Sequence, residues 1–191
     1  MSSVNRTLTQ RKLNVTDSMD RCESRDRAVA SGQVQQHEPQ ALIQGFLETR
    51  YRVQLEPALV VLVGQSSAML DSLAGSAGWA ILTAWNPDAT PQGADRNRRA
   101  NQALLDDLLI NRTGPVIKTI HLAQQDSEQP TWPEEQGWFF AIDHVNQVHG
   151  LAQRYGQLGS LIGQPGQAIE LWLYGKRWPA SLPAHVRRWS S

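Results

Sequence analysis

The chain of 191 residues contains a single cysteine, Cys22. One cysteine cannot form an internal disulfide, and no set of cysteines and histidines has the spacing of a zinc site. Proteins without disulfides are typical of reducing compartments, although secreted proteins without them also exist. We therefore expect a cytoplasmic protein without a structural metal.

Long hydrophobic runs are also missing. No apolar run approaches the roughly 20 residues of a membrane-spanning helix. The first residues lead into no apolar segment, which argues against a secretory signal, and several acids before position 27 argue against a transit peptide. The sequence thus predicts a protein with no membrane partner.

An excess of charge of either sign is absent, since 18 basic residues balance 18 acidic ones. A dedicated duplex-DNA binder needs a strongly basic face, which this balance argues against. A local basic patch remains compatible with it. The hydrophobic share of 40% is enough for one packed core, so a single domain with appendages is expected.

The motifs of several large enzyme classes are missing too. There is no Gly-x-Ser-x-Gly elbow, no Walker loop, and no Gly-x-Gly-x-x-Gly after a strand. His144 and His149 are five residues apart rather than four, so one helix face cannot present both to a metal. Residues 64–67 could bind an anion at a strand-to-helix junction, but no lysine supports them. We therefore expect no metal and no cofactor.

Composition divides the chain into three segments. Residues 1–38 are polar and almost free of periodic apolar positions, which predicts a flexible arm. Residues 39–175 carry the apolar periodicity of one α+β domain. Residues 176–191 form a basic and aromatic tail. Such a tail could touch nucleic acid, but a surface tail that packs one tryptophan and leaves its arginines solvated is favoured.

Apolar patterns place the secondary structure of the domain. Helices are predicted near residues 41–47, 69–73, 94–109 and 145–155, and strands near 51–55, 58–63, 79–85, 116–122, 138–142, 160–162 and 168–173. The continuous apolar run at 58–63 is typical of a strand buried on both faces. Asp143 is expected to cap the last helix. Trp79, Trp138 and Trp172 lie within strands and are expected in the core.

The order of these elements predicts the fold. From Thr83 onward it is strand, helix, strand, strand, helix, strand, which is the split βαβ arrangement of ferredoxin-like domains. The strand, short helix and strand before it would be an N-terminal βαβ extension of the same sheet, with a right-handed crossover if its strands are parallel neighbours. We predict an α+β sandwich with one mostly antiparallel sheet and helices packed on it.

The most informative stretch is residues 81–87, an apolar strand that ends in an Asn-Pro turn. Pro87 stops the strand because it has no backbone N–H to donate. Ligands often bind at the carboxyl ends of strands, and the loop after Pro87 is long enough to fold back. The candidate ligand-binding residues are Thr83, Trp85, Asn86 and Asn97.

Acidic and imidazole groups supply the candidate catalytic residues. Glu134 and Glu135 precede an aromatic strand, and a shielded carboxylate there could act as a general acid or base. Adjacent carboxylates usually point apart, so they are not a ready metal pair, and a solvated loop is the other interpretation. His121 ends a predicted strand on the side of the Asn-Pro turn and is the one histidine nominated for a cleft.

These motifs together resemble the bacterial domain-of-unknown-function family 3293, over roughly residues 40–175. The resemblance rests on the Leu-Thr-Ala-Trp-Asn-Pro block at 82–87, Asn97, and the segments at 46–53, 132–135 and 155–157. One departure is that Gln136 and Gly137 stand where the family places a small hydroxyl residue. The family has no established activity, so the resemblance implies a domain boundary and candidate positions only.

Two functions from different classes remain open. In the first, a soluble binding or regulatory domain holds a small polar ligand, a peptide or a nucleic acid through Trp85, Asn86, Asn97 and Glu134. In the second, a hydrolase or transferase uses Glu134 or Glu135 as general base and Asn86 as an orienting amide. A carboxylate within hydrogen-bond reach of Asn86 in a concave, partly dry pocket would favour the enzyme.

Both asparagines also have a purely structural interpretation. An asparagine before a proline commonly starts a turn, and Asn97 could tie the long loop back onto the strand. In that case the amide groups of Asn86 and Asn97 anchor a loop and hold no ligand.

Overall fold

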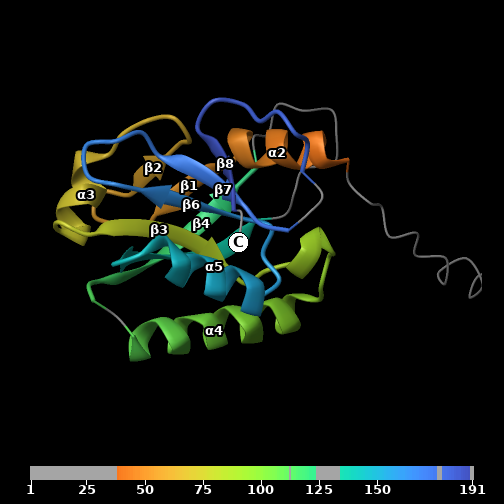
Figure 1. The fold of residues 1–191 in the computed structure, drawn as a ribbon. Helices are drawn as coiled ribbons and strands as arrows, with labels where there is room; N and C mark the ends of the chain where they lie inside the picture. The colour runs from red at the N-terminus through yellow and green to blue at the C-terminus, as the bar shows by residue number, and fades with distance from the viewer. Residues whose placement is uncertain (1–37, 112, 124–133, 176–177, 190–191) are drawn as a thin grey trace, which may run out of the picture. The chain divides into compact units, whose positions relative to one another are not determined.

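A computed structural model describes residues 38–111, 113–123, 134–175 and 178–189. The chain divides into two compact units, Met1–Gln35 and Gln36–Ser191, and all described residues belong to the second. The predicted arm lies outside the described residues except for Glu38. The second unit is an α+β domain (Figure 1).

Eight strands form one curled, mostly antiparallel sheet, in the spatial order β2-β1-β4-β5-β3-β6-β7-β8. Their bounds are β1 Arg50–Val53, β2 Leu59–Val61, β3 Gly78–Thr83, β4 Val116–Leu122, β5 Glu135–Ile142, β6 Gly159–Gly163, β7 Glu170–Leu173 and β8 Val186–Arg188. Every pairing is antiparallel except that of β7 with β8. The predicted α+β class and the hairpin of β6 and β7 are therefore confirmed.

The α-helices are α2 Pro39–Glu48, α3 Ala68–Ala74, α4 Ala94–Ile110 and α5 Val145–Arg154, and a short 3-10 turn, η1, spans Pro87–Ala89. The predicted cap at Asp143 is wrong, because His144 is the N-cap of α5. Gln147 accepts from the backbone N–H groups of Asp143 and His144, which secures this end of the helix. Within the described part of the chain no helix has the length and apolar character needed to cross a bilayer.

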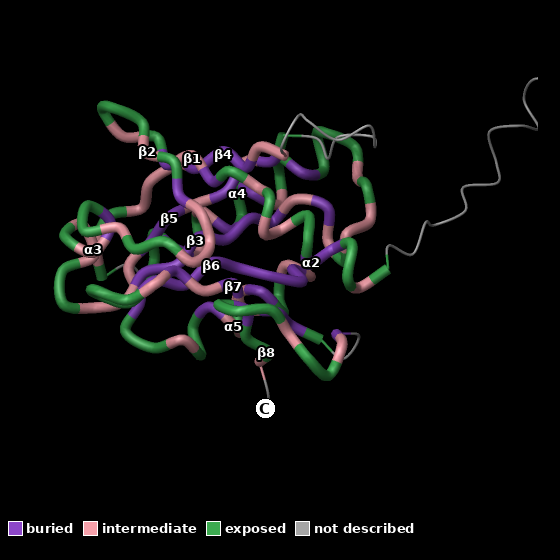
Figure 2. Tube along the Cα trace, turned by 90° about the horizontal axis from the view of Figure 1, so that it is seen from above, coloured by how far each residue is buried: buried purple, intermediate pink, exposed green. Residues whose placement is uncertain are grey.

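The middle of the sheet, at β3 and β6, is buried on both faces (Figure 2). Successive strand residues point to opposite faces, so Ile81 packs with α2 and α3 while Leu82 packs with α4 and α5. Figure 1 shows α4 and α5 together on one side of the sheet, with α2 on the other. Of the three expected core tryptophans, Trp79 is fully buried, whereas Trp138 and Trp172 are half-buried.

Two strands differ from the sequence prediction. β2 is not buried on both faces: among the described strands it pairs with β1 alone, and Val60 is 48% exposed. It is also no neighbour of β3, because β1, β4 and β5 lie between them. β8 was not predicted, since its three residues follow a polar segment; they pair with β7, and Val186 is buried in the core. Both outcomes depend on long-range pairing, which local patterns do not specify.

Candidate functional site

The backbone turns sharply where β3 ends. Asn86 has the left-handed angles φ 46° and ψ 59°, which asparagine tolerates better than most residues. Pro87 then opens η1 with its fixed φ. Asn86 is nevertheless only 6% exposed. Its side chain is therefore fixed inside the protein at the end of β3.

Asn86 and Asn97 bind each other reciprocally. The Asn86 backbone N–H donates to Asn97 Oδ1 at 3.0 Å, and Asn97 Nδ2 donates to Asn86 Oδ1 at 2.9 Å. The backbone N–H of Gln92 donates to the same Asn86 oxygen at 2.9 Å, and the Gln92 carbonyl accepts from Asn97. These bonds hold the loop after β3 against the first turn of α4.

The other end of the Asn86 amide contacts a carboxylate. Asn86 Nδ2 donates to Glu135 Oε1 at 2.8 Å. Glu135 is the first residue of β5 and is 8% exposed, whereas Glu134 is exposed to solvent. β5 thus begins three residues before the predicted strand, and the two adjacent acids differ in environment. The structure brings Asn86, Asn97 and Glu135 together.

His121 lies beside this carboxylate. It stands opposite Glu135 on one neighbouring strand and opposite Tyr51 on the other. Its ring meets the ring of Tyr51 edge-on, with centroids 4.9 Å apart, and His121 Nε2 lies 3.0 Å from Thr119 Oγ1. Burial lowers the pKa of His121 to about 3, so the imidazole is neutral at pH 7.

Tyr51 completes the set of buried polar groups. Its hydroxyl donates to the carbonyl of Phe46 at the end of α2. Burial, and then the charge of Glu135, raise the pKa of Tyr51, so the phenol stays protonated. We call Tyr51, Asn86, Asn97, His121 and Glu135 the rim cluster. The sequence did not nominate Tyr51, although strand alternation puts it on the face of its partner His121.

Gly137 makes room for the imidazole. A Cβ at this position would lie 2.7 Å from His121 Nε2 and 2.7 Å from the carbonyl oxygen of Leu82. A larger residue therefore cannot occupy this point of β5 unless both His121 and the backbone of β3 move. Gly137, which is part of the departure from the family pattern, thus leaves space for the His121 ring. The carbonyl of Gln136 also accepts the hydroxyl of Thr83 at 2.6 Å.

Thr83 and Trp85 border the rim cluster. Thr83 Oγ1 accepts from the backbone N–H of Trp85 at 3.1 Å, which starts the turn. Trp85 is half-buried, and its indole N–H is buried without a partner in the described part of the chain. Its carbonyl accepts from Gln157 Nε2 at 3.0 Å. The hydroxyl of Thr83 is thus used in hydrogen bonds within the fold, while the buried indole N–H of Trp85 has no partner among the described residues.

The segment after α5 supports the same turn. Gly156 has φ 62°, and a Cβ there would lie 2.8 Å from Pro87 Cβ. Its carbonyl accepts from the backbone N–H of Asp88 at 2.7 Å. The Tyr-Gly-Gln segment at 155–157 therefore buttresses the Asn-Pro turn, which links two separate parts of the family pattern.

Metal-ligand groups, cavities and one further segment were also compared with the rim cluster. No three histidine, cysteine or acidic residues there are grouped as a metal site would require. The two best-formed cavities in the described chain, each of about 380 Å³, are lined by other residues than the rim cluster. Of the segment at 132–135 that contributes to the family resemblance, residues 132 and 133 lie outside the described residues.

The family resemblance can be compared with known sequence families. The sequence model of the family described as "Protein of unknown function (DUF3293)" matches residues 82–159. The resemblance is thereby confirmed over this segment. It runs from β3 to the start of β6, less than half of the chain, and contains four members of the rim cluster but not Tyr51. No curated protein and no solved structure matches the chain.

Proposed function

We propose that this DUF3293-like protein is a binding domain whose ligand site is the rim cluster and the Asn-Pro turn beside it. The observation that carries the proposal is the bond from Asn86 Nδ2 to the buried Glu135 carboxylate at 2.8 Å, next to the neutral His121. Burying ionisable groups is costly, and clusters of them with shifted pKa values are typical of functional sites. Thr83, Trp85 and Asn97 frame this site.

The chemistry of the cluster favours a small polar ligand, or a peptide end, with N–H groups. Glu135 is an acceptor, and Asn86 holds one of its oxygens in a fixed place. A ligand ammonium or amide N–H would complement this carboxylate, and the half-buried Trp85 offers a flat face. Such a ligand needs no metal or cofactor.

A nucleic-acid partner for the C-terminal segment is not favoured. Arg187 donates to Glu170 Oε1 at 2.9 Å, and Arg188 donates to the carbonyls of Trp178 and Pro179. Trp178 is buried, and its indole N–H donates to the carbonyl of Tyr174. The described basic and aromatic groups of this segment therefore serve its own packing.

An enzyme is the second candidate. Glu135 lies within hydrogen-bond reach of Asn86, as a general base oriented by an amide requires. Glu134 is less suited, because an exposed carboxylate is not shielded from water. The two cavities of about 380 Å³ in the described part of the chain lie away from Asn86, so neither of them supports this mechanism. We therefore place binding before catalysis.

We also propose a ferredoxin-like core within the larger sheet. The strands β4-β5-β3-β6 lie side by side and antiparallel, and the chain visits them with one helix after β3 and one after β5. That order supports a split βαβ unit. The division at residues 38 and 175 and a cytoplasmic location remain predictions, the latter supported by the lone Cys22.

A thermal-shift screen tests the binding site. Amino acids, amines, short peptides, nucleotides and metals would be added to the full chain and to Glu135→Gln, with Glu134→Gln as the matched control. A ligand at a hundred times its Kd stabilises the folded state by about 2.7 kcal/mol. We expect a compound with an amino or amide group to raise the Tm of the wild type and of Glu134→Gln, but not of Glu135→Gln.

Two results would overturn the proposal. One is that no compound shifts the wild-type Tm. The other is an equal shift in both variants, which would place the ligand away from Glu135. Turnover of a bound compound that stops in Glu135→Gln would favour the enzyme instead.

A further inference from the structure

A cavity-bearing region lies away from the rim cluster and shares no residue with it. This groove, of about 380 Å³, runs between α4 and α5 on the sheet face that these helices cover. Its floor includes Val116, the first residue of β4, and Phe140, which lies near the end of β5. A volume near 400 Å³ with an apolar floor is in the range of small-molecule sites.

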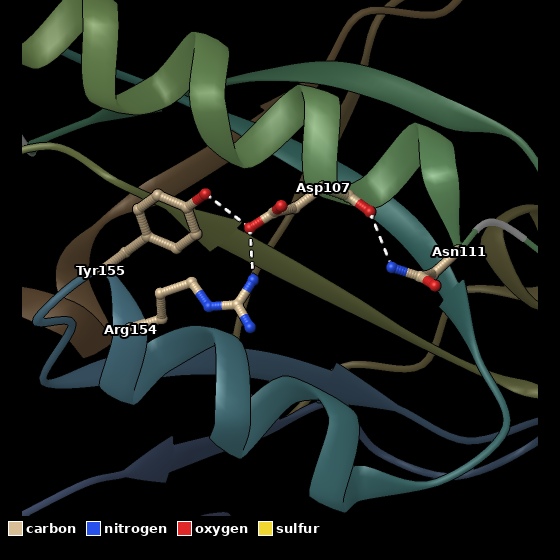
Figure 3. Close-up of polar contacts among 4 residues, drawn as sticks. All are labelled: Asp107, Asn111, Arg154 and Tyr155. Atoms are coloured by element: carbon tan, nitrogen blue, oxygen red, sulfur yellow. Dashed lines mark hydrogen bonds and ion pairs between the residues drawn. The ribbon is translucent and has the colours of Figure 1, made fainter.

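One end of the groove carries a clasp of three side chains (Figure 3). Arg154 Nη1 and the hydroxyl of Tyr155 both donate to Asp107 Oδ2, each at 2.7 Å. Bonds from Tyr155 and then Arg154 lower the pKa of Asp107, which keeps it ionised. The charges of Asp107 and Arg154 cancel, so the groove does not select strongly for an ion of either sign.

The clasp leaves polar atoms available. Within the described chain Asp107 Oδ1 accepts no hydrogen bond, and Arg154 Nε and Nη2 donate none. Asn111 Nδ2 donates to the carbonyl of Asp107 at 3.2 Å, which leaves its Oδ1 without a donor. The clasp therefore carries both an acceptor and donors that no described residue uses, and the side chains of Asp107 and Arg154 are 29% and 64% exposed.

Gly150 keeps the groove open. It lies inside α5 and lines the groove, and a Cβ built there would meet nothing within 4 Å. Glycine inside a helix is less stable than alanine, and no close packing requires it here. Gly150 and Phe140 line the same groove, and Gly150 adds no side chain to it.

We propose that the groove between α4 and α5 binds a small, flat, uncharged molecule with an amide-like edge, of the kind a nucleobase presents. The carboxylate oxygen of Asp107 would accept the ligand N–H, and the guanidinium of Arg154 would donate to the adjacent carbonyl. Phe140 and Val116 would contact the flat face. This inference is independent of the function proposed for the rim cluster.

Uridine is the probe, because its ring carries an N–H beside a carbonyl, and 3-methyluridine lacks that N–H. Binding would be followed by ¹H–¹⁵N chemical-shift titration of the full chain. Gly150→Leu adds a side chain to the groove lining, at a position where a Cβ meets nothing within 4 Å. Gly45→Leu is its matched control, because Gly45 is also a helical glycine with nothing within 4 Å of a Cβ.

We expect uridine to shift the Gly150 amide signal and to bind at least about tenfold more weakly to Gly150→Leu, with Gly45→Leu unchanged. We expect 3-methyluridine to bind at least about tenfold more weakly than uridine. No shift with uridine up to about 10 mM, or equal affinity in Gly150→Leu, would refute the groove as its site. Equal binding of both nucleosides would refute the amide-edge recognition. Loss in Glu135→Gln with retention in Gly150→Leu would assign uridine to the rim cluster instead.

Discussion

At the scale of single residues, Asn86 is the centre of the hydrogen-bond network. It donates to Glu135 and Asn97 and accepts from Asn97 and Gln92. One side chain thus joins the end of β3, the start of β5 and the first turn of α4. This arrangement combines the two interpretations of the asparagines, since a loop anchor also fixes the carboxylate of the proposed site.

Asn86→Ala and Asn97→Ala are expected to be coupled. Each should cost about 1–3 kcal/mol of unfolding free energy, because each leaves buried polar groups of the other without partners. The double variant should cost less than the sum by at least about 0.5 kcal/mol. Urea unfolding of the four proteins measures this. Additive losses would show that the two amides act separately.

The buried His121 is expected to make the stability of the folded state depend on pH. Its pKa is about 3 in the folded state and about 6.5 when unfolded, so the unfolded chain binds the extra proton between these values. Stability linked to His121 should be complete above pH 6.5 and fall on acidification, by up to about 1.4 kcal/mol per pH unit.

The measurement is urea unfolding of the wild type and His121→Asn at several pH values from 7 to 4.5. The wild type should lose more stability than the variant across this range. Equal slopes would mean that the folded imidazole takes up the proton, and a rise in wild-type stability would mean an ion pair between the imidazolium and Glu135.

At the scale of elements, tight packing between neighbouring strands predicts a sensitive glycine. Gly163 of β6 faces Trp79 of β3, and a Cβ there would lie 2.1 Å from the indole Cε2. The indole cannot move aside easily, since its N–H donates to Asp71 of α3 at 2.9 Å. Gly163→Ala should therefore cost about 3 kcal/mol or more.

Thermal or urea unfolding of Gly163→Ala checks this, beside Gly45→Ala as a glycine in open space. The control should be neutral or slightly more stable, because alanine favours the helix. Wild-type stability in Gly163→Ala would show that the sheet can open at this contact without cost.

The elements also show what the sequence could predict. Periodicity located α4, β4 and the hairpin of β6 and β7, because each carries its own apolar pattern. It missed β8 and the edge position of β2, because strand pairing is a long-range property. At the site, the sequence predicted the turn at Pro87 and the return of Asn97 to it, but it did not predict that Glu135 lies in β5. That entry depends on pairing with His121, which lies on another strand.

At the scale of the whole molecule, the described domain is expected to fold without the preceding segment. Residues 1–37 lack an apolar periodicity, and Glu38 supplies the carbonyl that caps α2 by accepting from Leu42. Removing residues 1–37 should therefore change the Tm by less than about 2 °C in a calorimetric scan. A loss of many degrees would show that the segment packs on the domain.

The two proposed ligand sites, the rim cluster at the end of β3 and the groove between α4 and α5, lie in separate parts of the domain. The first is made of buried ionisable groups, and the second is an open cavity with a neutral ion pair. The two are distinguishable by which residues respond to a ligand.

The central claim, that the rim cluster is the ligand site, is tested most directly by mapping the bound ligand. The best compound from the thermal-shift screen would be titrated into ¹⁵N-labelled protein, with the Asn86 and Asn97 side-chain amide signals assigned from their alanine variants. We expect these two signals and the Glu135 backbone amide to shift together, and we expect the shifts to vanish in Glu135→Gln but to persist in Glu134→Gln. A ligand that binds and leaves all three signals in place would contradict it.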